Sequence, residues 1–134
     1  MFASQTNPLK AYENVGLETE VQSASPHKLI LLLFEGAKQA ILIAKAGIEQ
    51  NDIPKKGSAI SKAIGIILNG LRASLNLEEG GKLSEDLWAL YDYMGRRLLH
   101  ANLHNDMAAL DEVLGLLNEI HSAWIEIGNM PEAQ

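Results

Sequence analysis

The stretch that decides the fold runs from Ser25 to Ile48 and reads SPHKLILLLFEGAKQAILIAKAGI. Ser25 can cap a helix N-terminus through its hydroxyl, and Pro26 suits the first helical position. The residues that follow are apolar nearly all round a helical wheel, which is typical of a helix buried on most sides. We therefore predict a helix over residues 26–50 that is central in the fold or lends surface to another molecule.

Two leucines in this helix lie outside its main apolar face. Leu31 and Leu42 lie eleven residues apart and fall together in the middle of the polar arc. If both are exposed, they are candidates for a contact site. If they lie under residues 1–24, the N-terminus is a flap. If the other helices bury them, the helical-wheel assignment for this helix is wrong.

Three further amphipathic helices are predicted. Apolar residues recur at three- and four-residue steps over 56–76, from an N-cap at Ser84 to about residue 102, and from an N-cap at Asp106 to about residue 127. Pro54 and the pair Gly80–Gly81 separate the first three helices, and Gly128, Asn129 and Pro131 stop the last. With no β alternation, the pattern predicts an all-α fold, an antiparallel up-and-down four-helix bundle.

Small residues and a second apolar ridge suggest more surface than the bundle needs to bury. Glycines at 36, 47, 65, 70, 95 and 115 fall inside predicted helices, which indicates close helix packing or a shallow groove for another helix. Trp88, Gly95, Leu99 and Leu103 form a second ridge on the third helix.

The N-terminal residues 1–24 are polar and mixed, and we separate them from a bundle domain at 25–130. Tyr12 and Val15 lie three residues apart and could share a helical turn. The segment is either a frayed tail or a mobile flap that docks through these two side chains.

Composition excludes several functions. The 134 residues carry a net charge of −6, which argues against non-specific nucleic-acid binding and against an anionic membrane surface. No cysteine is present, so disulfides and thiolate zinc sites are excluded. The longest aliphatic or aromatic run, 29–34, is too short to span a membrane, and no signal peptide begins the chain.

The residues offer little catalytic chemistry. No phosphate loop, nucleophile elbow or dinucleotide fingerprint is present. His100 and His104 are spaced to share a helix face, but no third ligand is evident, so we predict no metal, no cofactor and no enzymatic activity. A helix-in-groove interaction protein is the leading interpretation, and packing in a homodimer is its competitor.

Four stretches together carry a family resemblance. They are Tyr12 with ASPHKLILLLFEGA at 24–37, LNGLRASLN at 68–76, EGGKLSEDL at 79–87, and LYDYMGRRLLHAN at 90–102 with Trp124 beyond it. In this order the chain resembles the FliS family of flagellar secretion chaperones, which bind flagellin in the bacterial cytoplasm before its export. Phe34–Glu35 departs from the family's usual Tyr-Asp or Tyr-Glu, and Gly95 stands where a larger residue is common.

The resemblance implies a function. A cytoplasmic chaperone of this family would bind the disordered C-terminal segment of flagellin, which folds into helical pieces around it, prevent premature polymerisation and present the client to the flagellar type III export apparatus. Some relatives also bind an anti-sigma regulator. The segment around Tyr12 would be the family's mobile flap over part of the client site.

Residue roles follow from the resemblance only in part. The predicted partner-binding residues are Tyr12, Val15, Leu29, Leu33, Ile64, Leu68, Leu71, Arg72 and Leu75. The leucines and Ile64 are assigned to either the core or the groove. Residues Arg72, Tyr91, Asp92, Arg96 and Arg97 match family positions, and bundle-stabilising polar contacts are the alternative explanation for them.

Overall fold

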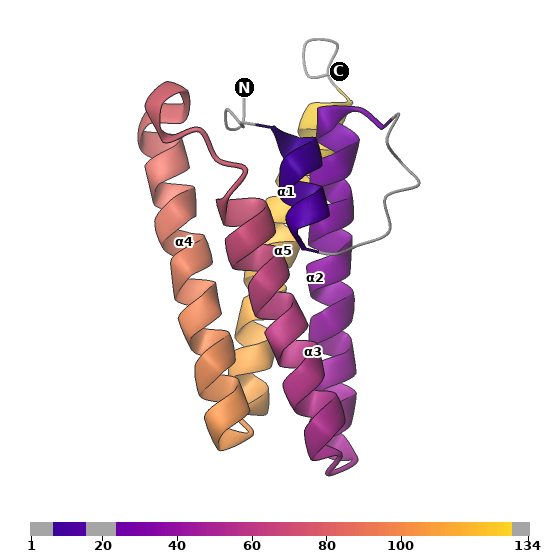
Figure 1. The fold of residues 1–134 in the computed structure, drawn as a ribbon. Coiled ribbons are helices and arrows are strands. Elements are labelled where there is room, and N and C mark those ends of the chain that lie inside the picture. Colours follow the sequence, from indigo (N-terminus) through magenta and orange to yellow (C-terminus); the bar gives the residue numbers. More distant parts are fainter. Residues whose placement is uncertain (1–6, 16–23, 130–134) are drawn as a thin grey trace.

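The computed structural model describes residues 7–15 and 24–129, and every regular element in this part of the chain is helical. Pro131, which was predicted to help stop the last helix, lies outside it, as do the rest of the predicted flap and the C-terminal tail. The elements are α1 (Pro8–Asn14), α2 (Pro26–Glu49), α3 (Ile53–Gly65), the π-helix η1 (Ile66–Arg72), α4 (Leu77–His104) and α5 (Met107–Gly128). Figure 1 shows the four long helical segments side by side, with α1 against them.

The start of α2 confirms the prediction for the central helix. The Ser25 hydroxyl accepts a hydrogen bond from the backbone N–H of Lys28 at 3.1 Å, and Pro26 occupies the first turn. The helix continues to Glu49. Its buried side chains pack toward α1, α3, η1 and α5. The predicted central position of this helix is therefore correct.

The second long helical segment begins earlier than predicted. Asp52 caps α3 by accepting from the backbone N–H of Lys55 at 3.1 Å, and Pro54 lies in the first turn rather than between helices. Proline is tolerated there because the first N–H groups of a helix have no intrahelical partner. The segment then continues as η1 and ends at Arg72, not near residue 76.

The predicted N-cap at Ser84 is wrong. Asn76 caps the segment instead, because its side chain accepts from the backbone N–H groups of Glu78 and Glu79. The helical turn that follows is interrupted at Gly81, whose φ of 58° is left-handed and favours glycine. Ser84 lies beyond this kink and is fully buried.

The last helix begins as predicted. The Asp106 carboxylate accepts from the backbone N–H of Ala109 at 3.2 Å and caps α5. Asn105 ends α4 in the left-handed conformation, with φ of 50°, so the chain reverses within two residues. Short connections of this kind are what the sequence predicted between these helices.

The core is aliphatic and centred on α2. The largest fully buried side chains are Ile30, Leu33, Phe34, Ile41, Ile60, Ile66, Ile67, Leu71, Met94, Leu98, Leu110 and Leu117. Among the six glycines that the sequence placed inside helices, three allow close approach: Gly47 to Lys56, Gly70 to Leu33, and Gly95 to Leu68. Gly65 and Gly115 have open space where a Cβ would lie, so close packing does not explain them.

Candidate partner-binding surface

Helix α1 covers part of the bundle surface. Asn7 caps it through its side chain, and its two buried side chains, Ala11 and Tyr12, face α2 and η1. Tyr12 is only 5% exposed. A frayed tail would leave this tyrosine in solvent, so the described part of the N-terminal segment is docked.

Gly70 lies close beneath this segment. A Cβ there would lie 3.0 Å from the nearer methyl of Leu33 and 3.1 Å from a methyl of Val15. Val15 follows α1, Leu33 belongs to α2 and Gly70 to η1, so one glycine receives side chains from two other segments. We call the surface marked by Leu33 and Gly70 the α1-docking surface.

The docking surface includes a backbone of unusual geometry. The π-helix η1 spans seven residues, whereas most π-helical geometry occurs as single-turn bulges, frequently at functional sites. It packs against α1, α2, α3 and α4. The sequence carried no signal for it, because the apolar spacing over 56–76 fits an ordinary α-helix.

Eight of the nine predicted partner-binding residues are buried or pack against the core in the structure. Leu29, Leu33, Leu71 and Leu75 are core residues, and Tyr12 is buried in the docked helix. Val15, Ile64 and Leu68 are partly buried against the core. Of the nine, the structure brings Val15 and Leu33 together at Gly70, and it places Leu68 at Gly95 instead.

Arg72 is the last residue of η1, and its side chain lies against α4. Its guanidinium pairs with Asp92 at 3.1 Å and lies over the Trp88 ring at 4.7 Å from the centroid. Arg96 also pairs with Asp92, at 3.3 Å. The Arg72 contacts hold η1 against α4, as the alternative of bundle-stabilising polar contacts predicts, whereas the Arg96–Asp92 pair lies within α4.

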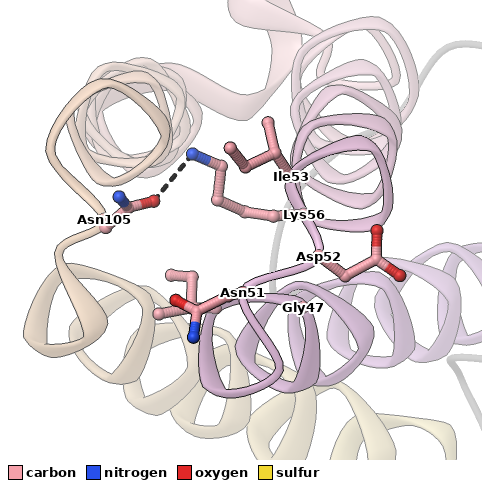
Figure 2. A pocket seen from close by; sticks show the side chains of 7 residues that line it. Gly47, Asn51, Asp52, Ile53, Lys56 and Asn105 are labelled. Carbon is pink, nitrogen blue, oxygen red and sulfur yellow. Dashed lines mark hydrogen bonds between the residues drawn. The ribbon is translucent and has the colours of Figure 1, made fainter.

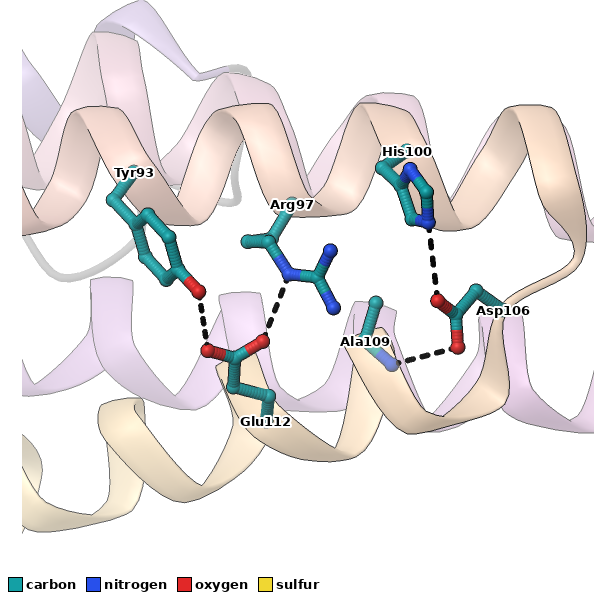
Figure 3. A network of polar contacts seen from close by, with 6 residues as sticks. All are labelled: Tyr93, Arg97, His100, Asp106, Ala109 and Glu112. Atoms are coloured by element: carbon teal, nitrogen blue, oxygen red, sulfur yellow. Dashed lines mark hydrogen bonds and ion pairs between the residues drawn. The ribbon is translucent and has the colours of Figure 1, made fainter.

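A second polar network joins α4 to α5 (Figure 3). The Tyr93 hydroxyl and the Arg97 guanidinium both donate to the Glu112 carboxylate and lower its pKa. Near the turn, His100 pairs with Asp106, whose pKa is lowered first by the Ala109 N–H and then by this histidine. The polar groups of this network pair with one another, and none of them is arranged as a nucleophile beside a general base.

A small pocket lies where the α2–α3 turn meets the end of α4 (Figure 2). Its volume is about 140 Å³, and Lys56, Asn51, Asp52 and Asn105 supply its polar lining. The buried Lys56 ammonium donates to the backbone carbonyl of Asn102 at 2.9 Å and to the side-chain oxygen of Asn105 at 2.7 Å. A cation suits the C-terminal end of a helix, so Lys56 has a structural role here.

Exposed apolar side chains mark other parts of the surface. Leu42 is 48% exposed, whereas Leu31 is partly buried against the core, so only Leu42 behaves as the wheel predicted. Within the second ridge, Trp88, Leu99 and Leu103 are exposed, but Gly95 is buried. Sequence reasoning missed Ile53, which is 70% exposed because it starts α3.

Within residues 7–15 and 24–129, no three histidine, aspartate or glutamate side chains are grouped so that they could hold a metal ion. The helices in those ranges are too short or too polar to cross a membrane.

Comparison with known proteins gives consistent matches. A family model described as flagellar protein FliS matches residues 8–131. The flagellar secretion chaperone FliS of Salmonella typhimurium is 54% identical over 119 residues, which cover 89% of this chain and 88% of that protein. FliSB of Pseudomonas aeruginosa is 47% identical over 87% of this chain and 91% of its own, and FliS of Bacillus subtilis is 36% identical over 88% and 84%.

Proposed function

The chain belongs to the FliS family of flagellar proteins, and from this premise we propose that it is a cytoplasmic, non-enzymatic export chaperone for flagellin. In this proposal it binds the C-terminal segment of flagellin and prevents premature polymerisation. It then assists delivery to the flagellar type III secretion apparatus. The printed name of its relatives, flagellar secretion chaperone, supports the general role.

The observation that carries the proposal is the docked α1. A seven-residue helix is too short to be stable alone, so its order depends on the surface beneath it. It contributes two buried side chains, Ala11 and Tyr12. A longer client helix with more apolar side chains could take its place on Leu33 and Gly70 at small cost to the bundle.

The proposed division of the chain follows from that exchange. Residues 1–24 act as the flap, and residues 25–130 form an antiparallel up-and-down four-helix body that holds the client. The proposed partner-binding residues are Tyr12, Val15, Leu29, Leu33, Ile64, Leu68, Leu71, Arg72 and Leu75. Those that are core residues in the described state would contact the client only after the flap leaves.

The energetics suit a chaperone that must release its client. A disordered segment that folds on binding buries apolar surface but loses conformational entropy, so its affinity per unit area stays moderate. The bound segment is then masked against self-association. We propose no catalytic step, cofactor or metal in this cycle.

Size-exclusion chromatography of the chain with full-length flagellin tests the proposal. A co-eluting complex is expected, and it should be lost when the C-terminal helical segment of flagellin is deleted. Unchanged binding of the truncated flagellin would contradict the proposed mechanism. The same assay with an anti-sigma regulator in place of flagellin tests that further partner.

Self-association is the competing function, because Leu99 and Leu103 are both more than half exposed on α4. Light scattering of the isolated chain at several concentrations separates the two ideas. A tight homodimer that does not bind flagellin would favour self-association. A monomer that forms an equimolar complex with flagellin would favour the chaperone.

A further inference from the structure

A second shallow pocket lies between α2 and α3, outside the area that α1 covers. Its volume is about 210 Å³, and its lining residues are Ala40, Ile43, Lys55, Ser58, Ala59 and Lys62. All six belong to α2 or α3. We call it the lysine pocket.

The lysine pocket lies on the same side of the helix pair as the α1-docking surface. On α2, Ala40 follows Leu33 by seven residues, which is about two helical turns. On the facing segment, Ala59 precedes Gly70 by eleven residues, but the last five of these belong to the π-helix η1, where the α-helical repeat does not hold. The shared face of α2 therefore places the two surfaces on one track along that helix.

Helix α1 fills only one end of this track. It has seven residues against 24 in α2, and it packs on α2 and η1. Figure 1 shows α1 beside the upper part of α2, near the start of that helix, while the α2–α3 turn lies at the opposite end. The lysine pocket lies toward that turn and takes no lining residue from α1.

The chemistry of the pocket indicates what fits it. Ala40 and Ala59 make a floor of small side chains on which a helix can lie close, and Ile43 adds a partly exposed apolar side chain. Lys55 and Lys62 are the charged residues that line it, and no acidic residue does. In a chain of net charge −6, this local positive charge favours an acidic partner.

Neither lysine is neutralised within the described ranges. Lys55 donates to the neutral amide oxygen of Gln50 at 3.1 Å, and no ion pair to Lys62 forms among residues 7–15 and 24–129. By contrast, Lys45 of α2 is paired with Asp111 at 2.6 Å. The two pocket lysines are thus available to carboxylates from outside.

We propose that the lysine pocket is the first-contact site for the client, and that it is used while α1 is still docked. An amphipathic client segment, with small apolar residues on one side and acidic residues beside them, binds here first and then extends along the track to displace α1. This inference rests on the proposed function and adds the order of events and the charge of the contacting segment.

The order has a physical advantage. A client that approaches the α1-docking surface directly must wait for α1 to leave. A client already held at the lysine pocket competes with α1 at high effective concentration, because the remaining contacts are then intramolecular. Electrostatic attraction to the two lysines acts mainly on the association rate.

Stopped-flow association with a synthetic peptide of the flagellin C-terminal segment tests the site. Lys55→Glu with Lys62→Glu should lower the association rate constant by about tenfold and flatten its salt dependence, with little change in dissociation. The matched control is Lys28→Glu with Lys82→Glu, which changes the net charge equally on exposed residues outside the pocket. We expect less than a twofold effect from the control.

The order of events has its own test because the chain contains no cysteine. Ser58→Cys places a single fluorophore in the pocket, and Lys10→Cys places one on the exposed side of α1. The pocket probe should respond in an earlier phase than the α1 probe. A response of α1 that precedes or coincides with that of the pocket overturns the proposed order.

The outcomes distinguish a failure of the first-contact site from a failure of the proposed chaperone function. If the peptide does not bind the unmodified chain, both fail. If it binds and the Lys55/Lys62 variant associates as fast as the control, the first-contact site is wrong while the chaperone function stands. Circular dichroism of each variant checks that the helical content is retained.

Discussion

Gly47 of α2 lies against the backbone of Lys56 in α3. A Cβ built on Gly47 would be 2.8 Å from the Lys56 backbone nitrogen and 2.9 Å from its Cα, closer than non-bonded carbon atoms approach. The obstacle is main chain, which cannot rotate aside as a side chain can. The two helices therefore reach this spacing only because residue 47 has no side chain.

We predict that Gly47→Ala destabilises the chain by roughly 1–3 kcal/mol, the usual cost of overpacking a core. Gly115→Ala is the matched control, because nothing lies within 4 Å of its added Cβ. Alanine should stabilise that exposed helical position by up to about 1 kcal/mol. Urea unfolding followed by circular dichroism measures both, and a neutral Gly47→Ala would contradict the close approach.

A substitution at Gly70 tests the docking of α1 and not the packing of the bundle. An added methyl would press on Leu33 and Val15, and the short α1 should yield before the core does. We expect Gly70→Ala to weaken docking by about 1 kcal/mol, which corresponds to roughly fivefold faster hydrogen exchange in α1. Gly65→Ala, which meets open space, should leave α1 exchange unchanged.

These glycines show how far the sequence could predict the packing. Their spacing within apolar helices indicated close approach, and for Gly47, Gly70 and Gly95 this was correct. It could not separate them from Gly65 and Gly115, because the difference depends on which residue of a neighbouring helix lies opposite. That register is a property of tertiary packing and not of local spacing.

The helix N-caps were also predictable from the sequence only in part. Ser25 and Asp106 were recognised because each polar residue directly precedes a long periodic run, and both cap as predicted. Ser84 failed because Asn76 starts a turn that the glycine pair interrupts without ending the segment. The helix length near residues 77–83 was therefore underestimated.

The candidate site was only partly predictable. Tyr12 and Val15 were singled out from their spacing and the family resemblance, and the structure docks both. Whether leucines such as Leu33 belong to the core or to a contact surface was open, since α1 buries a surface that is also continuous with the core. A periodic pattern identifies an apolar face but not what covers it.

Two histidines predict how stability depends on pH. Burial lowers the pKa of His27, whose ring stacks on Trp124 at 4.7 Å, and of His121, where the neighbouring Lys38 adds to the effect of burial. The Lys38 ammonium can only donate, so Nδ1 of His121 accepts its hydrogen bond at 3.0 Å and must be unprotonated.

The sign follows from linkage. Because the folded-state pKa values lie below the ordinary 6.5, the unfolded chain binds more protons as the pH falls below 6.5. The free energy of unfolding should therefore decrease from about pH 6.5 downward. His27→Gln should reduce that slope by up to about one proton. Urea titrations between pH 5 and 8 provide the measurement, and a slope equal to that of the unmodified chain would contradict this role of His27.

Lys56 provides the last test, at the end of the bundle where two turns meet. Its ammonium links α3 to the final carbonyls of α4 through Asn102 and to the turn residue Asn105. Lys56→Met retains the apolar stem but leaves both oxygens without their donor, so we expect a loss of roughly 1–3 kcal/mol in unfolding free energy.

Lys82→Met is the matched control for that change. Lys82 has one ion pair, to Asp86 at 3.3 Å, but its side chain is 87% exposed, and exposed pairs within one helix contribute little. Its loss should cost less than about 0.5 kcal/mol. If the two variants lose equal stability, burial and the C-terminal end of α4 do not strengthen the Lys56 contacts. A larger loss for Lys56→Met, together with faster hydrogen exchange at residues 102–105, would assign this lysine the task of closing the lower end of the bundle.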